Sequence, residues 1–333
     1  MNKTKVGIIG LGGIAQLVHL PILSKMNNVD LFAASESNKN RGKIVSSKFN
    51  VKNVYSDYSK MLEMDELDAV IIATPTNTHE KIAIDCLNAG KNILIEKPGA
   101  KNYEEAEKIN KAAKKNKKIA MVGMNPRFRP DAMLLKSLIN SGELGDIFYV
   151  RSGWTRKRSS AEKWFLKKSS AGGGVMIDLG IGLLDLSLWL LNNPKPKSVT
   201  VQTYFHETQT VEDSAIALIR FKNSALINFE VSWSFHSETD KFALSTYGKG
   251  GTAHLNPLRA YKRIKSSQLD YTPAKTSNLK NLYKRSYENE LKHFIGSVKS
   301  NTEVISSIED TIATMKLLEG FYKSAASGKE IVF

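Results

Sequence analysis

The chain has 333 residues, which is long enough for two domains with separate cores. Hydrophobic residues make up 41% and charged residues 24%, as in ordinary globular proteins, and no uncharged apolar run reaches the roughly 18 residues of a membrane span. The single cysteine, Cys86, excludes an internal disulfide framework. The first strand begins at once, with no cleavable leader pattern before it, so these features predict a cytoplasmic protein without a membrane partner.

The net charge is +15, from 48 Lys and Arg residues against 33 Asp and Glu residues. Such an excess is compatible with a nucleic-acid partner, an anionic small molecule or a lysine-rich surface. The densest basic run, 108–118, ends a predicted helix that begins at Asn102 with Glu104 and Glu105 in its first turn. Acidic residues at the start of a helix and basic residues at its end interact favourably with the helix dipole. We therefore interpret the basic run as the solvent-exposed face of this helix. The chain shows no zinc knuckle, helix-turn-helix or stacked-aromatic pattern, and we expect no nucleic-acid partner.

The first part of the chain alternates short apolar strands with helical periodicity. This alternation predicts an α/β domain with a doubly wound parallel sheet over residues 1–124. The predicted strands are Lys5–Ile9, Leu31–Ser35, Ala69–Thr74, Asn92–Glu96 and Ala120–Met124.

After Met124 the pattern changes. A helix near 132–140 and a strand at Ile147–Gly153 precede a series of strands with no helices between them. This order predicts a C-terminal α+β domain, residues 125–333, with a large open, mostly antiparallel sheet and two closing helices. The later strands are expected at Ser198–His206, Ser214–Phe221, Ala225–Trp233 and Phe242–Gly248, and the helices at Glu288–Lys299 and Ile308–Ala326.

The first strand leads into GLGGIAQ, which has a G-x-G-x-x-A spacing. Gly10 permits a tight turn, Gly12 lets backbone amides approach a diphosphate, and Ala15 lets the following helix pack on the strand. Gly13 and Ile14 complete the turn, whose amides and helix dipole attract a phosphate group. A strand–turn–helix position makes a dinucleotide site the favoured interpretation over a purely structural turn.

Glu36 ends the second strand about 20 residues after the glycines, where an acid binds the ribose hydroxyls of a dinucleotide. A carboxylate repels a 2′-phosphate, so Glu36 favours NAD as the cofactor. Lys39 and Arg41 follow closely and leave NADP possible. Glu36 could also be a simple turn residue.

Two further turns, ATPTNTHE and IEKPGA, follow the third and fourth predicted strands. Ligands of doubly wound sheets bind beyond the carboxyl ends of the strands, so both turns should face the cofactor. Pro98 restricts the backbone of Lys97, whose ammonium group can exchange a proton with a substrate hydroxyl or carbonyl. A lysine after a strand is otherwise a common surface residue. The residues expected at the cofactor are Thr74, Pro75, Asn77, His79, Glu96 and Lys97.

Taken in order, these motifs resemble those of the Gfo/Idh/MocA oxidoreductases, which include glucose–fructose oxidoreductase and inositol dehydrogenase. The resemblance rests on GLGGIA, TPTNTH, EKP, GMNPRF, AGGGVMIDLG and the C-terminal segment that begins YENELKHF, and it covers nearly the whole chain. It implies a Rossmann domain, an open sheet often used for oligomer formation, and NAD(P)-dependent chemistry on sugars and polyols. It also implies that Lys97 is catalytic, that Asn125 helps to hold the nicotinamide, and that Arg127, Arg156 and Trp164 contact the substrate.

The segment Gly172–Leu191 reads as a helix with glycines at its start and two aspartates in an apolar run. On a regular helix, Asp178, Gly182 and Asp185 share one face. The family places an aspartate and, four residues later, a proton-transferring histidine on this helix, so Asp178 matches while Gly182 replaces the histidine. We expect Lys97 and Asp178 to be the catalytic residues and Gly182 to enlarge the substrate pocket. The histidines considered as substitutes are His19, His79, His206 and His236.

We therefore predict an NAD(P)-dependent oxidoreductase acting on a sugar-like or polyol hydroxyl or carbonyl, without a metal and as a homodimer or homotetramer. One alternative is a non-catalytic protein that senses NAD or a sugar. Another is an enzyme that retains NAD and catalyses a net non-redox reaction, such as glycoside cleavage or epimerisation. Glycines and aspartates that serve only helix packing are a third interpretation. Basic residues near the substrate loop suggest an anionic sugar: Arg151, Arg156, Lys157 and Arg158.

Overall fold

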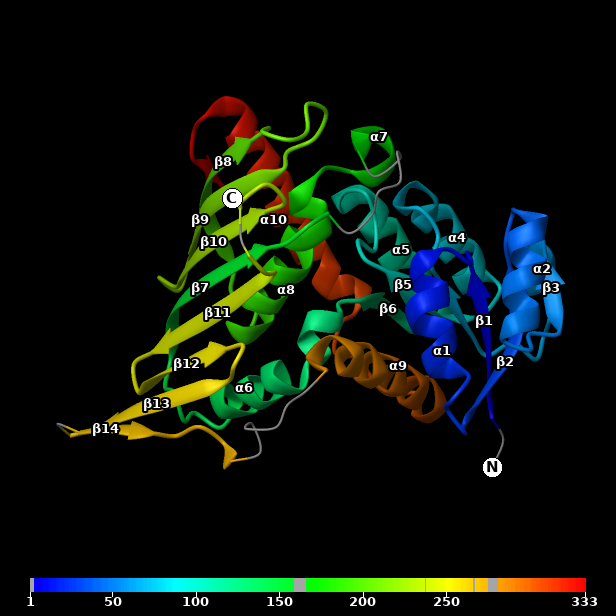
Figure 1. Ribbon diagram of the computed structural model, residues 1–333, viewed down its shortest axis with the longest axis horizontal. Helices are drawn as coiled ribbons and strands as arrows, with labels where there is room; N and C mark the ends of the chain where they lie inside the picture. The colour runs from blue at the N-terminus through cyan, green and yellow to red at the C-terminus, as the bar shows by residue number, and fades with distance from the viewer. Residues whose placement is uncertain (1–2, 159–165, 237, 266, 275–280) are drawn as a thin grey trace. The chain divides into compact units, whose positions relative to one another are not determined.

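The computed structural model describes residues 3–158, 166–236, 238–265, 267–274 and 281–333. The chain divides into two compact units, which are described separately. The first unit contains Met1–Met124 together with Tyr287–Ile312, and the second contains Asn125–Ser286 and Ala313–Phe333. Figure 1 shows the elements of both units along the chain.

The first unit is built on a six-stranded sheet with the order β3-β2-β1-β4-β5-β6, in which every strand pair is parallel. This is the Rossmann order, with its switch point between β1 and β4. All four residues of β4 are buried, as expected for a parallel strand covered on both faces. The predicted α/β fold class is confirmed. The strands are β1 (Thr4–Ile9), β2 (Val29–Ser35), β3 (Asn53–Tyr55), β4 (Ala69–Ile72), β5 (Asn92–Glu96) and β6 (Ala120–Gly123).

Helical segments connect these strands. Asn102 caps α5, because its side chain accepts a 2.9 Å hydrogen bond from the Glu105 amide. The segments are η1 (Ala15–His19), α1 (Leu20–Leu23), α2 (Lys39–Lys48), α3 (Tyr58–Leu62), η2 (Thr76–Thr78), α4 (His79–Asn88) and α5 (Tyr103–Asn116).

The segment Tyr287–Ile312, which we expected in the second domain, groups with the first unit. It includes most of α9 (Leu282–Ser300) and the start of α10 (Ile308–Ser327). Between these helices, Ser306 accepts a 2.8 Å hydrogen bond from the Val122 amide and donates its hydroxyl to the Val122 carbonyl. The returning chain thus satisfies backbone groups of β6, which lies at the edge of the sheet.

The second unit contains a nine-stranded sheet with the order β14-β13-β12-β11-β7-β10-β9-β8-β15. Only β7 and β10 pair in parallel within this order, which confirms the predicted mostly antiparallel sheet. The last four strands were not predicted. The strands are β7 (Ile147–Thr155), β8 (Pro196–Tyr204), β9 (Ser214–Phe221), β10 (Leu226–Ser232), β11 (Lys241–Gly248), β12 (Gly251–Leu255), β13 (Arg259–Ile264), β14 (Ser267–Asp270) and β15 (Ile331–Val332).

Helices α6, α8 and α10 cover one face of this sheet (Figure 1). The described helical segments of the unit include η3 (Asn125–Phe128), α6 (Pro130–Asn140), α7 (Lys168–Ala171), η5 (Met176–Gly180) and α8 (Ile181–Leu190). By length and composition alone, the stretch Lys168–Leu190 is apolar enough to cross a membrane, but 94% of its most apolar window is buried inside the protein. Core helices share this property.

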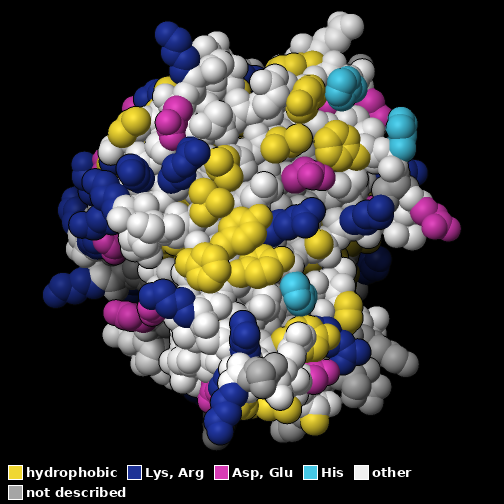
Figure 2. Space-filling model, turned by 90° about the vertical axis from the view of Figure 1, so that its left-hand side faces the viewer, with side chains coloured by type: hydrophobic (Ala, Val, Ile, Leu, Met, Phe, Trp, Pro, Cys, Tyr) yellow, Lys and Arg dark blue, Asp and Glu magenta, His cyan; other side chains and the backbone are white. Residues whose placement is uncertain are grey.

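The other face of the sheet carries outward side chains on its central strands. The rings of Tyr149 and Tyr247 stack there with centroids 5.1 Å apart. Leu226 lies beside Tyr149 in the register of β10 and β7, and Ile216 on β9 is 39% exposed. Figure 2 shows hydrophobic side chains grouped on this side among lysines, arginines and histidines.

Candidate active site

The glycine turn lies at the switch point of the Rossmann sheet. Gly10 has φ +89°, and a Cβ atom there would lie 2.7 Å from the Ala73 carbonyl oxygen, so glycine is required by both conformation and space. An added Cβ at Gly12 or Gly13 would meet nothing within 4 Å. The turn is therefore open on the side where a diphosphate would approach its amides, and it fits the predicted cofactor.

The helix after the turn contains a π-helical segment. Residues Ala15–His19 form a π-helical turn, with Ile14 preceding it, and α1 continues from Leu20. Ala15 is fully buried, as predicted for a small residue where helix and strand pack closely.

Glu36 is buried and its carboxyl group is held on both oxygens. Oε2 accepts a 2.9 Å hydrogen bond from the Leu11 amide, and Oε1 accepts bonds from the Asn38 amide at 2.9 Å and the Arg41 guanidinium at 3.0 Å. Burial raises the pKa of Glu36, but these hydrogen bonds outweigh it and the net pKa is lowered. Glu36 thus presents a carboxylate at the end of β2, tied directly to the glycine turn.

His79 connects the two turns that were predicted to face the cofactor. Its Nδ1 lies 2.9 Å from the Pro98 carbonyl oxygen, and its Nε2 lies 2.8 Å from the Thr74 carbonyl oxygen. The ring is fully enclosed, and burial lowers its pKa. Nearby, Pro75 and Asn77 belong to the turn containing η2. His79 therefore acts on the shape of both turns, a role that its sequence position alone did not reveal.

Lys97 is half-buried at the end of β5, and Glu96 fixes its backbone. Glu96 Oε2 accepts a 3.1 Å hydrogen bond from the Lys97 amide, and Glu96 Oε1 lies 2.8 Å from His19 Nε2. Burial raises the pKa of Glu96, but the hydrogen bond with His19, followed by the charge and the amide of Lys97, lowers it overall. His19, considered above as a substitute for the missing helix histidine, is buried against Glu96.

In the second unit, the glycines before η5 are required by packing. A Cβ atom at Gly173 would lie 1.8 Å from the Tyr322 hydroxyl, and one at Gly174 would lie 2.0 Å from the Glu212 carbonyl oxygen. The Glu212 carboxyl group accepts hydrogen bonds from the Gly174 and Met176 amides and from the Tyr322 hydroxyl. Glu212 thereby anchors the start of the helix that carries Asp178.

The predicted stripe of Asp178, Gly182 and Asp185 lies on a helix that is not regular throughout. Gly182 and Asp185 lie against η3, and Asp178 Oδ2 accepts a 3.1 Å hydrogen bond from the indole of Trp233. The π-helical turn η5 contains Asp178 and changes the 3.6-residue period on which the prediction relied. Asp178 is thus joined to the end of β10.

Arg127, a predicted substrate contact, forms a buried ion pair with Asp185. Its Nε and Nη2 lie 2.6 and 2.7 Å from the two carboxylate oxygens, and both side chains are 1% exposed. Asp185 thus takes an arginine partner, a contact that the sequence did not predict. Asn125, predicted at the nicotinamide, donates its side-chain amide to the Ser286 hydroxyl at 2.9 Å. The substrate role of Arg127 and the cofactor role of Asn125 stay predictions, and these contacts do not favour the former.

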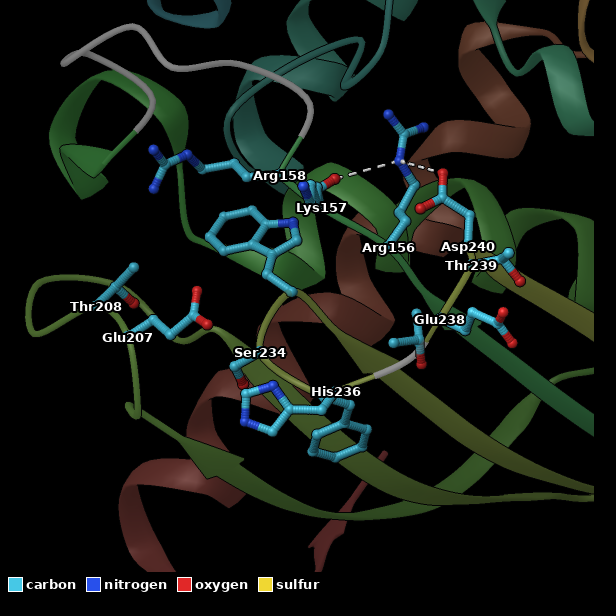
Figure 3. A pocket seen from close by; sticks show the side chains of 13 residues that line it. Arg156, Lys157, Arg158, Glu207, Thr208, Ser234, His236, Glu238, Thr239 and Asp240 are labelled. Atoms are coloured by element: carbon cyan, nitrogen blue, oxygen red, sulfur yellow. Dashed lines mark hydrogen bonds and ion pairs between the residues drawn. The ribbon is translucent and has the colours of Figure 1, made fainter.

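A pocket of about 490 Å³ opens in the second unit (Figure 3). Arg156, Lys157 and Arg158 line one side of it, and Ser234 and His236 line another. Trp164, also predicted here, lies outside the described residues. The pocket further includes Trp233, which connects it to Asp178, and residues that no sequence signal identified: Thr155, Glu207, Thr208, Phe235, Glu238, Thr239 and Asp240.

A buried carboxylate organises the polar wall of this pocket. Asp213 accepts hydrogen bonds from the Ser234 hydroxyl and from the amides of Glu207 and Thr208. On the opposite wall, Arg156 Nε lies 3.9 Å from Asp240 and donates to the Lys157 carbonyl at 3.3 Å, as the dashed lines of Figure 3 show. Across the described ranges, no group of three or more His, Cys, Asp and Glu side chains is arranged to hold a metal.

The sheet order, the open glycine turn and the carboxylate at the end of β2 define a dinucleotide-binding protein of the Rossmann class, joined to an α+β unit with a polar pocket. Two family patterns match the chain: "Oxidoreductase family, NAD-binding Rossmann fold" over residues 4–124, and "GFO/IDH/MocA C-terminal domain" over residues 133–254. The chain belongs to the Gfo/Idh/MocA family and is an NAD-dependent oxidoreductase.

Curated relatives match over almost their whole length. The chain is 27% identical to D-glucoside 3-dehydrogenase of Escherichia coli, covering 99% of this chain and 97% of the relative. It is 27% identical to myo-inositol 2-dehydrogenase of Thermotoga maritima, with coverages of 95% and 94%. It is 26% identical to glucose-6-phosphate 3-dehydrogenase of Bacillus subtilis, with coverages of 98% and 97%.

Solved structures share the fold. Levoglucosan dehydrogenase in complex with NADH has a TM-score of 0.91 at 22% identity, over 99% of each chain. GenD2 from gentamicin A biosynthesis, in complex with NAD, has a TM-score of 0.86 at 25% identity, over 100% of this chain and 97% of that one. These similarities extend the predicted architecture to the complete chain.

Proposed function

We propose that the protein transfers hydride between NAD and a sugar or polyol that binds in the pocket of the second unit. The observation that carries this proposal is the pocket wall, where Trp233 lies among hydroxyl and carboxylate side chains and bonds to Asp178. Sugars combine apolar ring faces with many hydroxyl groups, and an aromatic ring with convergent polar groups suits both. The relatives that act on glucosides, inositols and a glucose phosphate support the same class of substrate.

The charges around the pocket favour a neutral substrate over the anionic sugar considered from the sequence. Three basic side chains line it, but acidic side chains balance them, and Arg156 already faces Asp240. Carboxylates also accept hydrogen bonds from sugar hydroxyls. The balanced groups are Arg156, Lys157 and Arg158 against Glu207, Glu238 and Asp240.

In this proposal the first unit holds the cofactor and supplies the group that moves the proton. NAD, when bound, accepts or gives the hydride. Lys97 takes the hydroxyl proton during oxidation and returns it during reduction, from a turn that Glu96 and His79 hold in place. Asp178 serves the pocket as a buried carboxylate. The proposed cofactor-binding residues are Gly10, Gly12, Gly13, Ile14, Ala15, Glu36, Thr74, Pro75, Asn77, His79, Glu96, Lys97 and Asn125.

The first prediction tests catalysis through Lys97. Protein mixed with NAD⁺ and pooled polyols, neutral sugars, sugar acids and nucleotide sugars is expected to produce NADH fluorescence with a neutral pool. Lys97→Met should lower the rate at least about 100-fold, because it removes the proton-transferring group. Lys101→Met is the matched control, since Lys101 pairs with Glu105 at 3.0 Å and should be dispensable.

Full activity of Lys97→Met would overturn the assigned role. If no pool produces NADH fluorescence although NAD⁺ binding is confirmed, the result would favour the alternatives that Gly182 suggests: a sensing protein, or an enzyme with a net non-redox reaction. Nuclear magnetic resonance of the recovered pool separates these two, because only the second changes the sugar.

We also propose a cytoplasmic homodimer or homotetramer that associates through the outer face of the nine-stranded sheet. The stacked pair Tyr149 and Tyr247, with Leu226 and Ile216 on neighbouring strands, makes this face apolar enough to pack against a second copy. The single buried cysteine supports a reducing compartment.

A further inference from the structure

Glu290 on α9 is the most completely buried acid of the first unit for which the structure provides no hydrogen-bond partner. Its side chain is 0% exposed, and among the described residues neither carboxyl oxygen has a donor or acceptor within reach. Burial, and then the negative charge of Glu96, raise its pKa well above the ordinary value. Native proteins rarely bury such a group without a function, because an apolar side chain would be more stable there.

Glu290 follows Tyr287 by three residues on α9, so the two side chains share one face of this helix. Tyr287, one helical turn earlier on α9, contacts the His19 ring edge-on with centroids 6.2 Å apart. His19 lies 2.8 Å from Glu96, and Glu96 binds the Lys97 amide. His19 Nδ1 is also buried and, within the described chain, lacks a partner. The charged group that acts on Glu290 is thus Glu96 from β5, and His19 from η1 lies against Glu96.

The Glu290 carboxyl group and His19 Nδ1 can form a donor and acceptor pair if Glu290 keeps its proton. Two neighbouring buried carboxyl groups do not both ionise, and Glu96 carries the charge because His19 and Lys97 donate to it. A protonated carboxyl group is a donor. His19 with its proton on Nε2, toward Glu96, has an acceptor lone pair on Nδ1. A buried water molecule is the usual link between such atoms.

We propose that Glu290 is a positioning residue that donates, as a neutral acid, toward His19 Nδ1 and so orients the chain His19–Glu96–Lys97. The proposal rests on the proposed role of Lys97 for its effect on activity, but not for the state of Glu290 itself. It assigns the C-terminal helix α9 a part in shaping the turn that carries Lys97, although α9 is separated from that turn by almost 200 residues of sequence.

Two substitutions separate donation from packing. Glu290→Gln is neutral and still donates, whereas Glu290→Met fills a similar volume without donating. With the substrate found above, Glu290→Met should lower kcat about tenfold with KM changed less than twofold, and Glu290→Gln should restore kcat to within about twofold of the wild type. Asp131→Asn is the matched control: it alters a buried acid of α6 that pairs with Arg129 at 2.7 Å, and it should leave the Lys97 turn unaffected.

Spectroscopy tests the state of Glu290 without enzyme activity. The infrared carboxylic-acid band of the folded protein at neutral pH should lose intensity in Glu290→Gln. The ¹⁵N signals of His19 should show a proton on Nε2 in both proteins. Because folding raises the pKa of Glu290, the folded protein retains this proton to higher pH than the unfolded chain. Wild-type stability relative to Glu290→Gln should therefore fall as the pH rises above the ordinary glutamate range.

Each outcome decides the proposal. Wild-type kcat in a folded Glu290→Met protein would overturn the positioning role. An unchanged acid band in Glu290→Gln, or a His19 proton on Nδ1 alone, would overturn the donation. If Glu290→Met does not fold, the wild type and Glu290→Gln still decide through the infrared and ¹⁵N measurements. If Lys97→Met is fully active, the proposed function fails while these measurements still report on Glu290.

Discussion

At the scale of single residues, Glu36 combines two roles: its carboxylate is placed to bind ribose hydroxyls, and it also holds the glycine turn. The sequence placed it at the end of β2, and the structure adds that it accepts the Leu11 amide of the glycine turn and the Arg41 guanidinium. Arg41 is 47% exposed in its side chain, so the ion pair lies at the surface on one side and is buried on the other. The pair therefore affects the choice between NAD and NADP, because the carboxylate attracts the ribose hydroxyls of NAD and the arginine attracts the 2′-phosphate of NADP.

Glu36→Ala is expected to reduce the preference for NAD over NADP at least about tenfold, measured as the ratio of the two kcat/KM values. The change removes the repulsion of a 2′-phosphate and releases Arg41 toward it. The double variant Glu36→Ala with Arg41→Ala is the control, because it should lose the NADP gain. An unchanged cofactor ratio in Glu36→Ala would mean that Glu36 only shapes the turn.

At the scale of elements, the start of the helix η5–α8 is a packed junction. Tyr322 from α10 lies against Gly173. The Glu212 carboxyl group accepts hydrogen bonds from the Tyr322 hydroxyl and from the first amides of the helix. Burial raises the pKa of Glu212, although its hydrogen bonds lower it in part. The glycines are therefore a condition for this junction, and they need no catalytic explanation.

Gly173→Ala should lower the free energy of unfolding by about 1–3 kcal/mol, measured by denaturant titration. The new Cβ would lie 1.8 Å from the Tyr322 hydroxyl and would push it off Glu212. Gly296→Ala is the control, since a Cβ in that part of α9 meets nothing within 4 Å and should stabilise the helix by up to about 1 kcal/mol. Equal stabilities of Gly173→Ala and the wild type would contradict the packing role.

At the scale of the whole molecule, the uncovered face of the nine-stranded sheet should determine the oligomeric state. Ile216→Lys would put a charge into the centre of an apolar interface and should halve the solution mass, measured by light scattering after gel filtration. Leu17→Lys is the control, because Leu17 is 81% exposed and belongs to the first unit. A monomeric wild type, or an unchanged mass for Ile216→Lys, would contradict association through this face.

Local pattern by itself determined much of this protein. Strands β1, β4 and β5, the glycine turn and the Asn102 cap follow from neighbours in sequence, because short apolar runs, turn geometry and capping depend on residues only a few positions apart. The parallel α/β class and the Gfo/Idh/MocA family follow from the order of such signals. Boundaries were less well predicted, as at Thr74, which lies beyond the end of β4.

Only the tertiary structure decided the partners of the buried polar groups. Arg127 with Asp185, Trp233 with Asp178, and His19 with Glu96 each join residues more than 50 positions apart. No periodicity links such residues, because their meeting depends on how whole elements pack. A buried charge must find compensation wherever packing provides it, so its partner is a property of the folded chain and not of its neighbours in sequence.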